Sequence, residues 1–166
     1  LVGLACSQPS SFQGTVLESA DPAPLFQLPD QFGDRVSLGD YTGKVVVLTF
    51  LYTNCPDICP IITETLRRAH EQLGEDTEGV QFLAISVDPE RDTVERVHRY
   101  SEEKEMQHKW YFLVGEEEEL TGIWASYYVA AGRIDQERSS DALETLSEQD
   151  HDEDVAYLVT HTNAVY

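Results

Sequence analysis

The alternation of apolar and polar positions predicts an alternation of strands and helices along most of the chain. Residues 45–52 are apolar, β-branched or aromatic almost throughout, which is typical of a strand buried on both faces of a sheet. Apolar residues then recur with helical spacing between 60 and 73, where Pro60 suits a first turn and Gly74 a C-terminal stop. The same two patterns predict strands at 80–87, 110–114 and 155–166 and helices at 93–104 and 116–128.

Strands that alternate with helices indicate βαβ units around a sheet with parallel strands, so the sequence predicts one α/β domain. Two short apolar segments at 24–28 and 36–38 flank turn residues at 31–34, which predicts a small N-terminal hairpin. Residues 135–154 are rich in Asp, Glu and Ser without periodicity, and we expect a mobile acidic loop inserted before the last strand.

The first 23 residues differ in composition from the rest of the chain. Residues 1–5 are apolar or small, Cys6 follows them, and a polar stretch with proline and serine comes next. A small residue before a cysteine, with a polar tether behind it, is typical of the end of a bacterial lipoprotein signal, so Cys6 is a candidate for lipidation. We expect residues 1–23 to be a signal remnant and tether and residues 24–166 to form the domain. A lipid anchor would place this domain on the extracytoplasmic face of the bacterial cytoplasmic membrane or in the periplasm.

Charge narrows the range of partners. The 31 acidic residues exceed the 11 basic ones, which gives a formal net charge of −20. This acidic excess disfavours binding to DNA or RNA, and it disfavours adhesion to an anionic membrane through a basic face. It is compatible with a salty habitat, a cationic partner or a metal ion. No run approaches the ~20 apolar residues of a membrane-spanning helix. The chain starts without Met and stops at Tyr166 within a predicted strand, so we expect a longer protein whose C-terminal end is truncated here.

Candidate chemistry is concentrated in residues 53–60, TNCPDICP, between the first long strand and the first helix. Ligand sites of open α/β sheets lie at this position, beyond the carboxyl ends of the strands. Cys55 and Cys59 each precede a proline, which disfavours helical backbone angles, and we expect Cys59 near the N-cap of the helix. The partial positive charge of a helix N-terminus favours thiolate over thiol. Such a pair can close a reversible disulfide, bind a soft metal, or be two small buried side chains.

A third ligand for a metal bound there would have to be His, Met or a carboxylate, because the domain has only these two cysteines. Paired thiolates select copper(I), zinc or iron–sulfur, and two cysteines are too few for an iron–sulfur cluster. His70 and His98 lie on predicted helices beside charged residues, and we expect both to be solvated. His108 falls in a polar connector and His151 in the acidic segment. His161 lies in the last predicted strand, where the spacing alone favours a structural histidine over a ligand.

Further segments accompany the cysteine motif, in this order along the chain: GKVVV at 43–47, SVDPERDT at 86–93, LTG at 120–122, YY at 127–128 and VTHT at 159–162. Together with TNCPDICP, they resemble the Sco (SenC/PrrC-type) family of copper chaperones for cytochrome c oxidase assembly. The similarity covers about residues 22–166 in the family's order, and the combination of T-x-C-P-D-x-C-P with S-V-D-P-E-R-D-T is highly specific.

The resemblance implies a thioredoxin-like fold with a central mixed sheet flanked by helices. It also implies that Cys55, Cys59 and His161 bind one copper ion per chain, as Cu(I) or Cu(II), because two thiolates hold Cu(I) and an imidazole accommodates Cu(II). Asp57 lies between the cysteines and could tune the thiolate charge or meet an acceptor, and a helix-start or turn role is equally open for it. Asp88 opens the second motif and could face the site, although an aspartate before a proline also suits a plain turn.

The leading hypothesis is a metallochaperone that delivers copper, and possibly reducing equivalents, to the binuclear copper site of cytochrome c oxidase subunit II. Other periplasmic copper chaperones or thioredoxin-like reductases would be further partners. The alternative is an enzyme, a thiol–disulfide oxidoreductase, or a redox sensor, that uses Cys55 and Cys59 without metal. Oxidoreductases of this fold space their cysteines as C-x-x-C, and the wider gap here favours metal capture.

Three departures from the family pattern bear on these expectations. Thr160 stands where many members have aspartate, which changes the electrostatic setting of His161. The acidic segment 135–154 is longer and more charged than usual. The strand and helix that follow the histidine strand in the family are missing, so His161 is expected to be less firmly held.

Overall fold

The computed structural model describes residues 22–135 and 157–161. Three parallel strands form the central sheet in the order β3–β4–β5. Their bounds are β3 (Val45–Leu51), β4 (Val80–Ser86) and β5 (Tyr111–Leu113). Helix α1 (Ile58–Leu73) connects β3 to β4, and α2 (Val94–Glu103) connects β4 to β5. The predicted α/β architecture with βαβ units is therefore confirmed.

The sheet strands are buried on both faces, as their apolar runs predicted. Phe50 and Leu51, consecutive in β3, have no exposed surface, and neither has Ile85 in β4. Consecutive side chains of a strand point to opposite faces, so two buried in a row mean that both faces are covered. Fully burying one such side chain is worth about 1.5–3 kcal/mol relative to leaving it exposed.

Two antiparallel strand pairs accompany the central sheet. β1 (Gln27–Pro29) pairs with β2 (Arg35–Ser37), which confirms the predicted N-terminal hairpin. β6 (Ala131–Asp135) pairs with β7 (Tyr157–His161). Within the described residues, the antiparallel pairing thus lies in two separate small sheets, and the central sheet is parallel rather than mixed as the sequence predicted.

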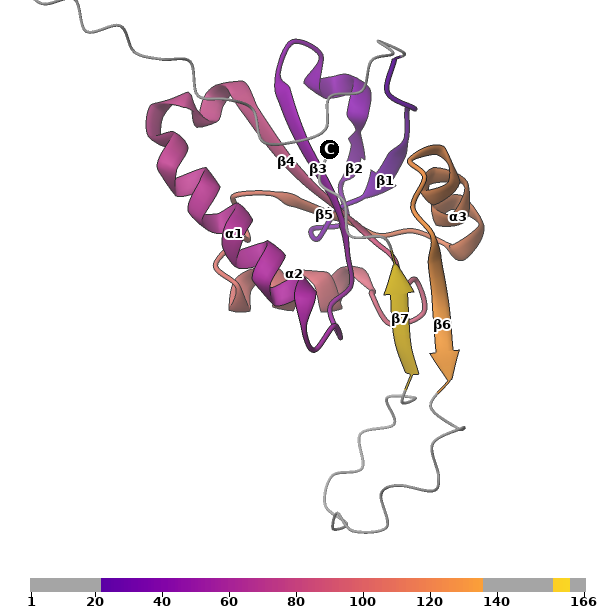
Figure 1. The fold of residues 1–166 in the computed structure, drawn as a ribbon. Helices are drawn as coiled ribbons and strands as arrows, with labels where there is room; N and C mark the ends of the chain where they lie inside the picture. Colours follow the sequence, from indigo (N-terminus) through magenta and orange to yellow (C-terminus); the bar gives the residue numbers. More distant parts are fainter. Residues whose placement is uncertain (1–21, 136–156, 162–166) are drawn as a thin grey trace, which may run out of the picture.

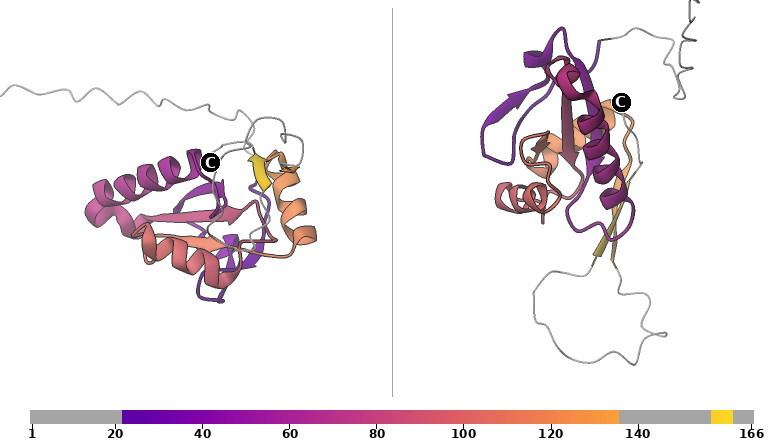
Figure 2. Two further views of the ribbon diagram at one scale, coloured as in Figure 1. Left: turned by 90° about the horizontal axis from the view of Figure 1, so that it is seen from below. Right: turned by 90° about the vertical axis from the view of Figure 1, so that its left-hand side faces the viewer.

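The helices and the β6–β7 pair surround the central sheet. Figure 1 shows α1 and α2 on one side of the central strands and α3 (Glu117–Ser126) on the other. The loop between β3 and α1 and the β6–β7 pair lie at the same end of the molecule in Figure 1 and in the right-hand view of Figure 2. β3 finishes at this end, where the sequence predicts the site. Among the helices of the described residues, none is long and apolar enough to cross a membrane.

One buried side chain fixes the hairpin to the sheet. Nε2 of Gln31, in the hairpin turn, donates to the carbonyl oxygens of Gln107 and Trp110, each at 3.0 Å. Its Oε1 accepts the backbone N–H of Phe112 at 2.7 Å. All three bonds reach β5 or the connection that leads into it, so the hairpin is held against that strand.

Helix α1 begins at Ile58, two residues before the predicted start at Pro60. Pro60 is then the third helical residue, where a missing N–H costs little because the N–H groups of the first turn have no intrahelical acceptor. Asp57 is the N-cap. Cys59, expected near the N-cap, therefore lies inside the first turn of the helix.

The C-terminal part corrects one expectation and leaves others untested. β6 was not predicted, because its sequence AGRID is short and only partly apolar. Asp135, expected to open the acidic loop, is the last residue of β6. The remainder of that segment, with His151, lies outside the described residues, as do residues 1–21 with Cys6. The acidic loop and the division of the chain after residue 23 stay predictions.

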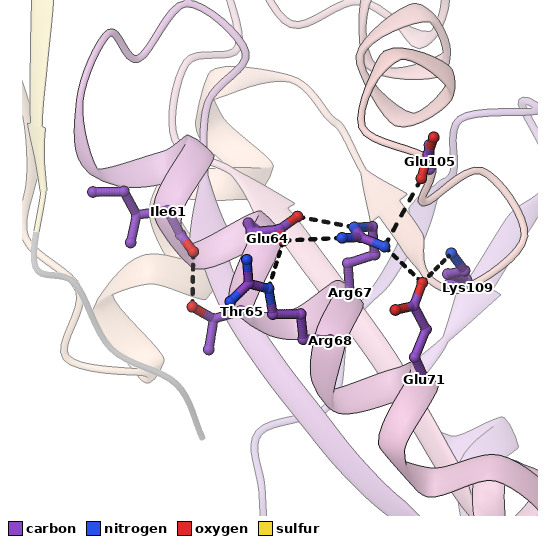
Figure 3. Close-up of polar contacts among 8 residues, drawn as sticks. All are labelled: Ile61, Glu64, Thr65, Arg67, Arg68, Glu71, Glu105 and Lys109. Atoms are coloured by element: carbon purple, nitrogen blue, oxygen red, sulfur yellow. Dashed lines mark hydrogen bonds and ion pairs between the residues drawn. The ribbon is translucent and has the colours of Figure 1, made fainter.

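A cluster of ion pairs on α1 ties the helix to the connection between α2 and β5 (Figure 3). Arg67 contacts Glu64 at 2.9 Å and Glu71 at 2.6 Å on its own helix, and Glu105 at 3.8 Å across the gap. Lys109 also reaches Glu71, at 3.4 Å. Hydrogen bonds from Arg67 and from the arginine after it lower the pKa of Glu64 to about 2. Surface pairs of this kind add little stability each, and their effect here is to orient α1.

Candidate metal centre

The two cysteines of the TNCPDICP motif lie together at the carboxyl end of β3. Cys55 is in the loop after the strand and Cys59 is in the first turn of α1, and both are buried with free thiols. The backbone N–H of Cys59 donates to Sγ of Cys55 at 3.4 Å. The turn of the chain into the helix therefore brings the two predicted site cysteines together.

The two thiols have different acidities. Burial raises the pKa of Cys55, but hydrogen bonds outweigh it and lower the pKa overall; they come from the side chain and backbone of Cys59, the backbone of Asp57 and the side chain of Tyr52. The pKa of Cys59 is raised, first by burial and then by its hydrogen bond to Cys55. Cys55 is thus the more acidic of the two thiols, and hydrogen bonds from Cys59 are the largest cause of its lowered pKa.

Tyr52 connects this loop to β7. Its side chain is hydrogen-bonded to Cys55 and to the backbone of Val159, which lies in β7. The pKa of the hydroxyl is raised to about 12, first by burial and then by Cys55. Val159 precedes His161 by two residues, so the contact brings the backbone of the histidine strand next to the cysteine loop.

Asp88 reaches the site through an arginine. Its carboxylate is buried, and Oδ2 accepts a hydrogen bond from Nε of Arg91 at 2.5 Å. The Arg91 guanidinium lies 5.9 Å from the centroid of the Tyr52 ring, within the range of a cation–π contact. Asp88 therefore holds Arg91 against the tyrosine that contacts Cys55.

Asp92, the second aspartate of SVDPERDT, is a further residue near the site that was not predicted from the sequence. Its side chain is only 2% exposed and accepts from the Thr53 N–H at 3.1 Å, the Thr53 hydroxyl at 2.6 Å and the Ser86 hydroxyl at 2.7 Å. Burial raises the pKa of Asp92 to about 6, against hydrogen bonds that lower it. Arg96 donates to Oδ1 of Asn54. Both residues that precede Cys55 are thus fixed by side chains at the start of α2, which the spacing of the motif alone does not reveal.

Asp57 contributes through its backbone. It is the exposed N-cap of α1, yet its side chain makes no capping hydrogen bond. Its backbone is instead hydrogen-bonded to the Cys55 sulfur. A role for its carboxylate toward an acceptor stays a prediction.

His161 is placed by its backbone alone. It is the last residue of β7, opposite Ala131 in the antiparallel register. Its side chain lies outside what the structure describes. Among the described side chains, no three His, Cys, Asp or Glu residues converge into a metal-binding group. Two of the three predicted ligands are therefore together, and the third stays a prediction.

Two other histidines are less solvated than expected. The His70 ring packs 5.7 Å from that of Phe82, and burial, followed by a nearby lysine, lowers its pKa. The His98 ring lies 5.5 Å from Phe32, which also stacks with His108 at 6.0 Å. These imidazole rings pack against Phe82 of the sheet and Phe32 of the hairpin turn, because their carbon atoms can contact apolar side chains while the nitrogens stay polar.

A cleft of about 560 Å³ lies between the end of β4, α3 and the β6–β7 pair. Its apolar wall includes Trp124 and Val159, and its rim carries carboxylates. The carboxylate-bearing residues are Asp88, Glu90, Glu116 and Glu117. Val159 thus contacts Tyr52 by its backbone and also lines this cleft.

The family model described as SCO1/SenC matches residues 15–166 of the chain. The chain belongs to the SCO1/SenC family. Among curated relatives, Protein SCO1 homolog 1, mitochondrial, of Arabidopsis thaliana is 36% identical over 143 residues, which are 85% of this chain and 37% of that protein. The human Protein SCO1 homolog, mitochondrial, is 32% identical over 143 residues and is covered over 42% of its length. The chain thus spans less than half the length of these relatives.

Solved SCO1/SenC structures share the fold. The crystal structure of Arabidopsis thaliana ScoI with copper bound has a TM-score of 0.66 and 35% identity, and the match covers 87% of this chain and 79% of that one. The likeness confirms the thioredoxin-like fold class predicted from the sequence.

Proposed function

We propose that this chain is a metallochaperone that holds one copper ion and delivers it, with reducing equivalents where these are needed, to the binuclear copper site of cytochrome c oxidase subunit II. The observation that carries this proposal is the pair of free, buried thiols joined by the bond from the Cys59 N–H to the Cys55 sulfur. The related ScoI structure that contains copper supports the same assignment.

The donor atoms fit a soft, monovalent cargo. Two sulfur ligands favour Cu(I) over hard cations, which prefer oxygen. Cys55 gives up its proton more readily than Cys59, so we assign Cys55 the first contact with the ion. Cys59 then loses its proton to solvent as its sulfur binds, and copper binding is therefore coupled to proton release.

His161 is the proposed third ligand. The nearness of its strand supports this assignment, because the backbone of Val159, two residues before His161, is hydrogen-bonded to the tyrosine that contacts Cys55. An imidazole would favour Cu(II) more than two thiolates alone do. Release to an acceptor would proceed by ligand exchange, because a three-coordinate ion leaves room for an incoming thiolate.

The metal-free redox role is a second candidate because the two thiols are unequal. One thiolate could attack a disulfide of a target and the other thiol could resolve the mixed disulfide, so that the target gains two electrons and two protons and Cys55 and Cys59 end as a disulfide. This role is compatible with copper delivery, since target cysteines must be reduced before they accept the ion.

We also propose the extracytoplasmic location that the N-terminal sequence favours. Lipidation of Cys6 would hold the domain at the outer face of the bacterial cytoplasmic membrane, where an oxidase subunit and periplasmic copper donors would be accessible. Mass spectrometry of Cys6 from membranes, with Cys6→Ser as the control, tests this part separately.

The test of the copper role is an anaerobic titration of the reduced protein with Cu(I) against a chromophoric chelator. We expect one copper ion per chain, with loss of competitive binding in Cys55→Ser and in Cys59→Ser. Cys6→Ser is the matched control, because it removes the third thiol and keeps Cys55 and Cys59, and it should bind like the wild type. Retained stoichiometric binding in Cys55→Ser would contradict the site, and absence of binding in the wild type would favour the redox role.

A further inference from the structure

Tyr52 touches both halves of the proposed copper site. The side chain of Tyr52 is hydrogen-bonded to the sulfur of Cys55. The backbone of Tyr52 is hydrogen-bonded to the sulfur of Cys59. Its carbonyl oxygen also accepts the Cys55 N–H, at 3.4 Å. A single residue at the end of β3 therefore contacts the two sulfurs that are proposed to hold the ion.

The hydroxyl of Tyr52 has two partners, and their chemistry sets the direction of each bond. The single proton of the hydroxyl goes to Cys55, because a sulfur that binds copper has lost its own proton and can only accept. The other partner, the backbone of Val159, then donates its N–H to the Tyr52 oxygen. The chain of hydrogen bonds therefore runs from the Val159 N–H to the Tyr52 oxygen, and from the Tyr52 O–H to the Cys55 sulfur.

The ring that carries this hydroxyl is held on its other side. It is buried, and the Arg91 guanidinium, itself bonded to Asp88, lies 5.9 Å from its centroid. The hydroxyl is therefore presented to Cys55 by a fixed ring.

We propose that Tyr52 is a positioning residue whose hydroxyl joins the Cys55 sulfur to β7 and sets the donor strength of that sulfur toward bound copper. The part that concerns copper rests on the proposed function, whereas the hydrogen bonds exist in the metal-free protein. A hydrogen bond to a thiolate withdraws electron density from sulfur, which disfavours Cu(II) relative to Cu(I) and tunes the potential of copper–thiolate sites.

The first test compares Tyr52→Phe with Tyr100→Phe. Both changes keep a buried ring and remove one hydroxyl; that of Tyr100 is hydrogen-bonded to Thr63 at 2.9 Å rather than to a sulfur. With one Cu(II) bound, the sulfur-to-copper charge-transfer band of Tyr52→Phe should move to longer wavelength, and that of Tyr100→Phe should stay in place. An unmoved band in Tyr52→Phe, or an equal shift in both, overturns the proposal.

The second test needs no copper. In the metal-free protein, the Val159 amide should exchange with solvent about fivefold faster in Tyr52→Phe, the usual weight of one neutral hydrogen bond, and at the wild-type rate in Tyr100→Phe. Equal exchange rates in all three proteins would refute the link to β7. Failure of the wild type to bind copper would instead count against the proposed function alone.

A third measurement guards against a variant that does not fold. In the wild type with Cu(II), transfer from H₂O to D₂O should shift the copper–sulfur stretching frequency in resonance Raman spectra. The shift should exceed that in Tyr52→Phe, because the Tyr52 proton adds to those of the backbone N–H groups of Cys59 and Asp57 on the same sulfur. A frequency that is the same in both solvents overturns the proposal without any substitution.

Discussion

Two buried polar clusters hold loops against different strands of the central sheet, one with a neutral side chain and one with charged ones. The neutral clamp is the amide of Gln31, which makes three hydrogen bonds to backbone groups of β5 and the connection before it. The charged clamp lies near the cysteines, where Asp88 and Asp92 hold Arg91 and Thr53. A neutral amide is sufficient where a side chain only has to fix the position of a loop. It offers both a donor and an acceptor without the cost of burying a charge.

The charged clamp lies close to the thiols and influences their acidity. Asp92 raises the pKa of Cys59, although burial and Cys55 have larger effects, and Asp88 supports the tyrosine that contacts Cys55. Burying these carboxylates costs stability and places charge beside atoms whose protonation changes when copper binds. The comparison of the two clamps therefore indicates that buried charge is used next to the thiols, where it affects their protonation.

The largest effect is expected when the charged clamp is broken. Arg91→Ala leaves the buried Asp88 carboxylate without its ion-pair partner, and removing one member of such a pair costs about 3–5 kcal/mol. Urea unfolding followed by circular dichroism measures the loss. A cost below about 1 kcal/mol would mean that solvent reaches Asp88 and that the clamp is not buried in solution.

Breaking the neutral clamp should cost somewhat less. Gln31→Ala leaves the Phe112 N–H and two carbonyl oxygens without their partner, and we expect a loss of roughly 2–3 kcal/mol in the free energy of unfolding. Copper stoichiometry should remain one per chain, because Gln31 holds the hairpin to β5, and β4 lies between β5 and the strand that leads to the cysteines. A drop in copper binding that exceeds the fraction unfolded would contradict the separation of the two clamps.

Asp92→Asn tests the charged clamp through the pH dependence of the free energy of unfolding. The folded pKa of about 6 lies above the unfolded value near 3.8, so between these values the folded protein keeps a proton that the unfolded chain has released. This group therefore makes the wild type less stable as the pH rises from about 4 to 6. Asp92→Asn should show a flatter change of unfolding free energy over that range; an identical pH profile in both proteins would mean that Asp92 is ionised normally.

The smallest effect is expected at Asp57. Its exposed side chain makes no capping hydrogen bond, so Asp57→Ala should change the free energy of unfolding by no more than about 0.5 kcal/mol. Its backbone contact with Cys55 survives the substitution, and Cu(I) affinity should be preserved. A clear loss of affinity in the chelator competition would assign the carboxylate a direct role at the metal.

The sequence predicted the parts of this molecule that depend on local pattern. The long apolar strands, the following helices and the juxtaposition of Cys55 and Cys59 all arise within a few residues of one another. Asp92 and Gln31 could not be recognised as clamps, because their partners are 39 and about 80 residues away in the chain. β6 was missed because a short strand is defined by its partner, β7, more than by its own residues.

The central claim is that two sulfurs from the cysteine loop and one imidazole from β7 hold a single copper ion. X-ray absorption at the copper edge of the Cu(II)-loaded protein, beside His161→Ala, tests it most directly. We expect two sulfur ligands and one histidine nitrogen in the wild type, and loss of that nitrogen, with both sulfurs kept, in His161→Ala. A wild-type spectrum with fewer than two sulfurs, or one that His161→Ala leaves unchanged, would contradict it.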